Sequence, residues 1–233
     1  MIRYGKVSTP RTITPGAFAR AVAIGALALL VGCSTKVVVP DQSIPEPLIA
    51  QLPLSVGARY PESFENFVHE ETVIGKDTWE IDLGRSNRLL FDKLFGSMFS
   101  GFQVLTAEED PADYGLDALI EPTIDAFEFS VPEQSQTDAF AVWIRYRIRV
   151  FDRNGDQIAN WPISAYGKSM TTTFGGDDAL RRAAVLAMRD AAALIILQMD
   201  KSTGISSLVK PDAVTAADEV AADQVEEMND DPR

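Results

Sequence analysis

The sequence contains one cysteine, Cys33, and one histidine, His69, in 233 residues. A zinc site of the usual Cys/His type needs three or four such ligands, so these counts exclude it. A catalytic triad would have to use His69, and no Gly-x-Ser-x-Gly motif supplies a serine nucleophile. We therefore expect no metal, no cofactor and no enzymatic activity.

Positive charge is also scarce, with 21 Lys and Arg against 34 Asp and Glu and a formal net charge of −13. Nucleic-acid binding draws on clustered Lys and Arg, so this balance excludes a nucleic-acid partner. Long hydrophobic runs are missing too. The longest, residues 21–32, is about a dozen residues, whereas a membrane-spanning helix needs about 20.

The first 32 residues have the parts of an export signal. Four basic residues and no acidic one precede the apolar run, which ends in Gly32 and Cys33. The alternative is a cysteine buried at the end of a short hydrophobic helix. The basic leader, the apolar run and the small residue Gly32 together favour an export signal. Removing the four positive charges takes the net charge from −13 to −17.

The residues Leu30-Val31-Gly32-Cys33 resemble the lipobox of bacterial lipoproteins. The resemblance implies cleavage between Gly32 and Cys33, followed by acylation of the thiol and of the new amino group. Two or more acyl chains, at about 0.8 kcal/mol per buried methylene, make a stable anchor in a lipid bilayer. In Gram-negative members of this family, an aspartate directly after the cysteine implies retention in the inner membrane. Ser34 occupies that position here, so the resemblance implies that the protein is anchored on the periplasmic face of the outer membrane.

The remaining chain divides by composition into three parts. Residues 33–51 begin with the acylated cysteine and carry three prolines, which predicts an extended tether. Residues 52–205 carry the periodic patterns of a single domain, and the acidic, aromatic-free end at 206–233 is typical of a disordered tail.

The patterns within the domain predict an α+β fold, an antiparallel β-sheet with two α-helices packed on one face. Helices are expected over 86–102 and 175–200, and strands in the segments 52–60, 69–84, 102–110, 116–131, 141–152 and 156–169. Asn154-Gly155 predicts a type I′ hairpin turn with positive φ at both residues. Pro162 cannot donate to a ladder, which places its strand at an edge or a bulge.

The clearest strand, 141–152, alternates apolar residues with a second set of side chains. That set is the candidate contact site: Trp143, Arg145, Arg147, Arg149 and Phe151. The three arginines could bind an anionic glycolipid or peptidoglycan. Alternatively they pair with Glu121 and Asp125 on a neighbouring strand, which is worth about 0.2–1 kcal/mol per pair. The two aromatic side chains are either partner contacts or covered by another layer.

Two further acidic groups have structural explanations. Glu121 and Asp125 beside arginines would both stay ionised, whereas acid–base catalysis needs carboxyls with separated pKa values. Asp152, Asn154 and Asp156 resemble part of a calcium loop, but the glycine position and the missing distal glutamate break that motif. A hairpin accounts for these residues better.

The order of elements behind a lipobox and a tether resembles small periplasmic lipoproteins: the ABC-type transport auxiliary, LPS-assembly and YajG-like families. The resemblance over about residues 52–200 is architectural, and only Leu30 to Cys33 match as a motif. It implies a non-enzymatic accessory or assembly subunit of an envelope transport or biogenesis machine. Its partner would be an envelope protein or a second copy of the chain, and the alternative is a glycolipid- or peptidoglycan-binding module.

Overall fold

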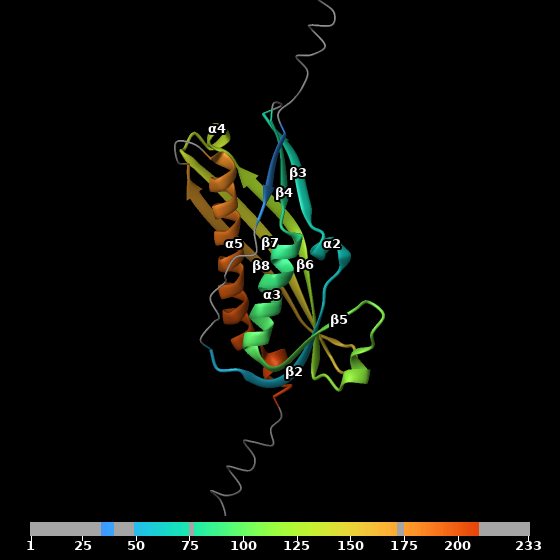
Figure 1. Ribbon diagram of the computed structural model, residues 1–233. Helices are drawn as coiled ribbons and strands as arrows, with labels where there is room; N and C mark the ends of the chain where they lie inside the picture. The colour runs from blue at the N-terminus through green and yellow to red at the C-terminus, as the bar shows by residue number, and fades with distance from the viewer. Residues whose placement is uncertain (1–33, 40–48, 75–76, 172–174, 210–233) are drawn as a thin grey trace, which may run out of the picture.

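The computed structural model describes residues 34–39, 49–74, 77–171 and 175–209. The leader 1–32, the lipobox residues Gly32 and Cys33, and residues 210–233 of the predicted tail lie outside the described residues. The described chain forms eight strands in two sheets together with two long helices, α3 and α5 (Figure 1).

The larger sheet has the strand order β5-β2-β6-β7-β8. Its strands are β2 (Leu52–Arg59), β5 (Phe99–Leu105), β6 (Ala118–Ser130), β7 (Ala139–Asp152) and β8 (Gln157–Met170). The pairs β6–β7 and β7–β8 are antiparallel, whereas β2 is parallel to both β5 and β6. The α+β class is confirmed. The sheet is therefore mixed rather than wholly antiparallel. A helix precedes β5 and carries the chain back to the end of the sheet at which β2 begins, so β5 runs parallel to β2.

The smaller sheet has the order β1-β4-β3, built from β1 (Ser34–Val38), β3 (Val68–Val73) and β4 (Asp77–Asp82). Strands β3 and β4 account for the strand structure predicted in segment 69–84; they pair antiparallel, and β1 lies parallel to β4. The structure differs here from the extended tether expected over 33–51. Val37 is fully buried and Val39 is 4% exposed, so these two valines join the core and fix residues 34–39 against the folded domain.

The two long helices, α3 (Gly84–Met98) and α5 (Gly176–Asp200), lie on one face of the larger sheet as predicted (Figure 1). α3 ends before the predicted residue 102, because Phe99 onward pairs with β2 as strand β5. Short helical turns, α2, η2, α4 and α6, occupy Glu62–Glu65, Pro111–Tyr114, Pro132–Ser135 and Thr203–Ser206. Within the described residues, no helix is both long enough and apolar enough to cross a bilayer.

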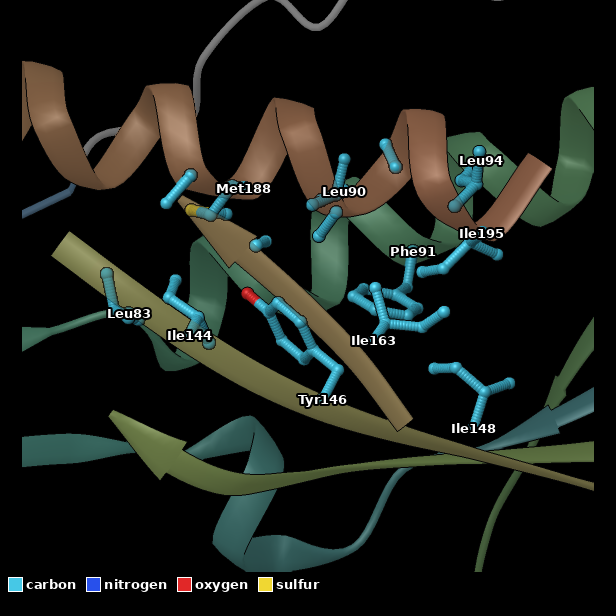
Figure 2. Close-up of a cluster of buried hydrophobic side chains, with 14 of the residues drawn as sticks. Leu83, Leu90, Phe91, Leu94, Ile144, Tyr146, Ile148, Ile163, Met188 and Ile195 are labelled. Carbon is cyan, nitrogen blue, oxygen red and sulfur yellow. The ribbon is translucent and has the colours of Figure 1, made fainter. Parts of the chain in front are cut away.

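The main core lies between these helices and the inward side of β7. Figure 2 shows the aliphatic and aromatic side chains that fill it, and all of those named here are at most 5% exposed: Leu90, Phe91, Leu94, Ile144, Tyr146, Ile148, Ile163, Met188 and Ile195. Burying a side chain of this size contributes about 1.5–3 kcal/mol. The inward half of the alternation predicted for residues 141–152 is therefore confirmed.

Small residues bring α5 unusually close to β8. The side of the helix that faces the sheet is fully buried and lined by alanines: Ala179, Ala183, Ala184, Ala187 and Ala191. On β8, a Cβ atom at Gly167 would lie 2.0 Å from the carbonyl oxygen of Ala183 and 2.4 Å from the backbone nitrogen of Ala187. Only glycine fits at this point of contact.

The β7–β8 turn differs from the predicted type I′ turn. Gly155 has a φ of 82°, but Asn154 does not have positive φ. The Asp152 carboxylate explains this, because its Oδ1 accepts hydrogen bonds from the backbone nitrogens of Asn154 at 2.8 Å and Asp156 at 3.0 Å. The turn is thereby held as a longer loop. The edge position predicted from Pro162 is confirmed, since β8 is the last strand of its sheet.

Candidate functional site: the outward face of the larger sheet

The face of the larger sheet opposite the helices carries all five candidate side chains of β7. Trp143 and Arg145 are exposed, while Arg147, Arg149 and Phe151 are half-buried. The intervening residues are buried against the helices, so the strand alternates as the sequence predicted. This side of β7, with its neighbours on β6 and β8, is called the outward face below.

Two of the three arginines are paired with the carboxylates that the sequence suggested. The Nη2 atom of Arg147 lies 2.5 Å from Asp125 Oδ2, and that of Arg149 lies 3.4 Å from Glu121 Oε2. Glu121 also pairs with Arg59, on the neighbouring strand β2, at 3.4 Å. A register shift between Ile124 and Ala126 gives Asp125 an extra position on β6, which is how a bulge can re-aim a side chain. Arg147 and Arg149 are therefore both paired with carboxylates, and Arg149 shares Glu121 with Arg59.

Arg145 differs from its two neighbours, because it forms no ion pair with any residue in the described ranges. Glu128, opposite Trp143 on β6, is likewise exposed and without an ion pair there. Both residues line a shallow hollow of about 250 Å³ whose other walls include Trp143, Ser164 and Tyr166. The outward face thus keeps Arg145 and Glu128 available beside an aromatic surface, and the exposed Lys168 lies on the same side of β8, two residues from Tyr166.

Trp143 and Tyr166 form an exposed aromatic pair at this hollow. Their ring centroids are 5.1 Å apart, and each residue is 43% exposed. They are directly opposite one another on β7 and β8. Sequence reasoning missed Tyr166, although a signal was present: Trp143 lies 11 residues before Asn154 and Tyr166 lies 11 residues after Gly155. A hairpin centred on that dipeptide pairs the two.

Phe151 lies apart from this hollow. It packs against a small separate cluster of buried leucines, Leu105, Leu116 and Leu119. Of the two interpretations given for the aromatic side chains of β7, coverage by neighbouring residues applies to Phe151, and exposure applies to Trp143. The exposed site therefore consists of Trp143, Tyr166, Arg145 and Glu128.

His69 takes part in packing and one polar contact. Its Nε2 lies 3.2 Å from Glu71 Oε2, and its ring lies 5.0 Å from Phe127 and 5.9 Å from Phe129, centroid to centroid. In the part of the chain that the structure describes, no three His, Cys, Asp or Glu side chains are grouped so as to hold a metal ion.

No family model and no curated protein matches this sequence. Similar solved structures include a hypothetical protein of Chlamydia trachomatis, with 10% identity, a TM-score of 0.40, and coverage of 66% of this chain and 98% of that one. A lipoprotein of Neisseria meningitidis has 13% identity and a TM-score of 0.30, with 64% and 100% covered. A protein of Caulobacter crescentus CB15 assigned as a lipoprotein has 12% identity and a TM-score of 0.34, with 53% and 83% covered. These likenesses are partial, so the function proposed below rests on the residues of this chain.

Proposed function

We propose that this chain is a lipid-anchored envelope protein, held by acylated Cys33 on the periplasmic side of the outer membrane. It acts as a non-enzymatic accessory that docks on an envelope protein through the outward face. The observation that carries the docking role is the exposed Trp143–Tyr166 pair beside Arg145 and Glu128, which form no ion pair within the described ranges.

The composition of this hollow favours a protein partner. Trp, Tyr and Arg are the residues most enriched in the energetically dominant centres of protein interfaces. Arg145 and Glu128 place one positive and one negative charge at the rim. They suit a partner surface that presents a negative and a positive charge in the matching positions, and such complementarity gives specificity. Arg147 and Arg149, two of the three arginines of β7, are already paired with carboxylates, which makes them less available to an anionic glycan.

The anchoring role rests on the lipobox and on the net charge. A mature chain of about −17 has no electrostatic attraction to an anionic lipid surface, so acyl chains must supply the membrane affinity. Metabolic labelling with palmitate tests this step. We expect the wild type to be labelled and Cys33→Ala to be unlabelled and to keep its leader; an unlabelled wild type would overturn the anchor.

Crosslinking in intact envelopes tests the docking role. We expect Trp143→Ala to reduce the crosslinked partner about tenfold or more, because truncating a central aromatic residue typically costs 2 kcal/mol or more of binding. Leu186→Ala is the matched control, since Leu186 is also 43% exposed but lies on α5, on the other side of the sheet. This control should retain the partner.

An Arg147→Glu variant separates the proposal from the glycan alternative. Under the docking proposal the crosslinked partner survives this change. Binding of glycolipid or peptidoglycan fragments that is lost with Arg147→Glu but retained with Trp143→Ala would overturn the proposal in favour of a ligand-binding module.

A further inference from the structure

The larger sheet has two edge strands, β5 and β8, and their free sides differ in how they are occupied. A free strand edge presents unpaired backbone N–H and C=O groups, and proteins usually block it with a proline, a charge or a covering element. An edge that lacks such protection is one to which another strand can be added.

The free side of β8 is blocked at three positions, four residues apart. Pro162 has no backbone N–H to offer. The backbone nitrogen of Tyr166 donates a hydrogen bond of 3.0 Å to Asp190 Oδ2 on α5. Helix α6 lies against the strand at Ile158, since a Cβ atom at Gly204 would be 2.5 Å from the carbonyl oxygen of Ile158. Strand β8 is therefore closed to a further strand over this stretch.

Strand β5 has no such protection. Its seven residues, FSGFQVL, include no proline and no charged side chain. Among the described residues, no hydrogen bond reaches the backbone of residues 100–105 except within the ladder with β2. Phe102 packs on α3, with its ring centroid 6.1 Å from that of Phe95, but Ser100 and Val104 stay exposed. This edge of the sheet is open.

We propose that β5 pairs with β5 of a second copy of this chain, antiparallel and across a two-fold axis, so that the two larger sheets become one. The alignment that pairs all seven residues is centred on Phe102 and places Ser100 of each copy opposite Val104 of the other. No charge faces a like charge in this pairing, because the strand carries none. Backbone hydrogen bonds along the two strands supply the affinity.

The inequality of the two edges favours a second copy as the occupant. If both edges were open, β5 of one copy could pair with β8 of the next, and head-to-tail contacts of this kind continue into open filaments. With β8 blocked, self-association through the sheet edge stops at two copies. Pairing β5 with β5 also covers the unprotected edge of every copy, as a closed two-fold dimer requires.

This interface is separate from the outward face and does not depend on the acylation of Cys33. Trp143 and Tyr166 lie on β7 and β8, at the other side of the sheet order, so the dimer leaves both copies of the hollow free. The net negative charge of the chain repels a second copy at long range, and salt screens this repulsion. We therefore expect the dimer to tighten as the salt concentration is raised.

The first test is the mass of the full chain, purified from membranes and measured by light scattering in detergent. A reductant is present throughout, so that no disulfide through Cys33 contributes. We expect the wild type to have twice the mass of one copy at micromolar concentrations. A wild type that has the mass of a single copy over this range would overturn the inference and leave the proposed function untouched.

Two double variants that differ in the sign of one charge test the pairing itself. Ser100→Lys with Val104→Lys places lysines opposite each other twice, and we expect dimerisation to weaken about a hundredfold or more, because juxtaposed like charges cost several kcal/mol. Ser100→Lys with Val104→Glu places a lysine opposite a glutamate twice, and this dimer should stay within about tenfold of the wild-type affinity. Equal dissociation of the two double variants would contradict the proposed pairing.

A third double variant, Gln157→Lys with Met170→Lys, adds the same two charges to the ends of β8, where both residues are exposed. It controls for the change in net charge and should dimerise as the wild type does. Loss of its dimer would place the interface at the wrong edge. The thermal midpoint of each variant confirms that the fold is intact, since all the substituted positions are exposed.

Discussion

At the scale of single residues, two polar side chains meet inside an otherwise apolar core. The hydroxyl of Tyr146 donates a hydrogen bond of 2.7 Å to Asn87 Oδ1, and both residues are fully buried. Burial raises the pKa of the Tyr146 phenol far above its ordinary value, so the group remains a donor. The Nδ2 atom of Asn87 has no hydrogen-bond partner among the described residues, so Tyr146 satisfies only half of this amide.

Replacing Tyr146 by Phe should lower the free energy of unfolding by about 1–3 kcal/mol, because it leaves a buried amide oxygen without a donor. Adding Asn87→Leu should recover most of this loss, because it removes the unsatisfied amide. Equilibrium urea denaturation of the single and double variants measures both effects. A Tyr146→Phe variant as stable as the wild type would show that the hydrogen bond is not needed.

The residues of the outward face were only partly predictable. Alternation alone placed Trp143, Arg145 and Arg147 on one face, because side chains of a strand alternate whatever their neighbours are. The pairing of Arg147 depends on the bulge that turns Asp125 outward. No local pattern in the sequence predicts that bulge. The coverage of Phe151 depends on leucines brought in from β5 and β6.

At the scale of elements, the contact between α5 and β8 sets the thickness of the helix–sheet layer. We expect Gly167→Ala to lower the free energy of unfolding by about 1–3 kcal/mol or more, because the added methyl group overlaps the backbone of α5. Gly96→Ala is the control, since its Cβ would be 3.7 Å from the nearest atom, a side-chain carbon of Phe102.

Gly96 lies within helix α3, where alanine is favoured over glycine by up to about 1 kcal/mol, so this control should be neutral or stabilising. Thermal unfolding of both variants makes the comparison. Equal stability of Gly167→Ala and the wild type would mean that α5 can move away from β8 without cost.

The elements themselves were largely predictable from the spacing of apolar residues. In β7 and β8 apolar residues alternate, as in a strand, and in α3 and α5 they recur every three or four residues, as in a helix. Their ends were less predictable, as at Phe99, where the residue that would continue α3 instead starts β5. The missed strand was β1. Val37 in β1 and Val39 directly after it are the only inward valines, too short a pattern to outweigh the prolines that come after them. Its place was decided by a distant partner, β4.

At the scale of the whole molecule, strand β1 joins the start of the chain to both the smaller sheet and α5. Beyond its ladder with β4, the carbonyl oxygen of Val38 accepts a hydrogen bond of 3.1 Å from Arg181 Nε, and that of Val39 accepts one from the hydroxyl of Ser86. Residues next to the proposed anchor therefore belong to the same core as the helices.

Paired threonine variants test this directly. Val37→Thr should lower the free energy of unfolding by about 1–3 kcal/mol, because it places a hydroxyl in a fully buried position. Val38→Thr, at a neighbouring position that is 47% exposed, should stay within about 0.5 kcal/mol of the wild type. Chemical denaturation of the two variants gives the comparison; equal effects would mean that β1 is not part of the cooperative unit.

The start of β1 at Ser34, directly after Cys33 in sequence, has a consequence for the proposed docking on an envelope protein. Trp143 and Tyr166 lie four residues from Ala139 and Met170, the strand ends nearest the β1 end of the fold, a distance of at most about 13 Å along each strand. If Cys33 is acylated as proposed, the short connection to β1 holds that aromatic pair close to the bilayer surface. Under the proposed anchoring, its counterpart would be a neighbour resident in, or resting on, the same membrane, because a protein free in the middle of the periplasm would approach this surface only past the lipid headgroups.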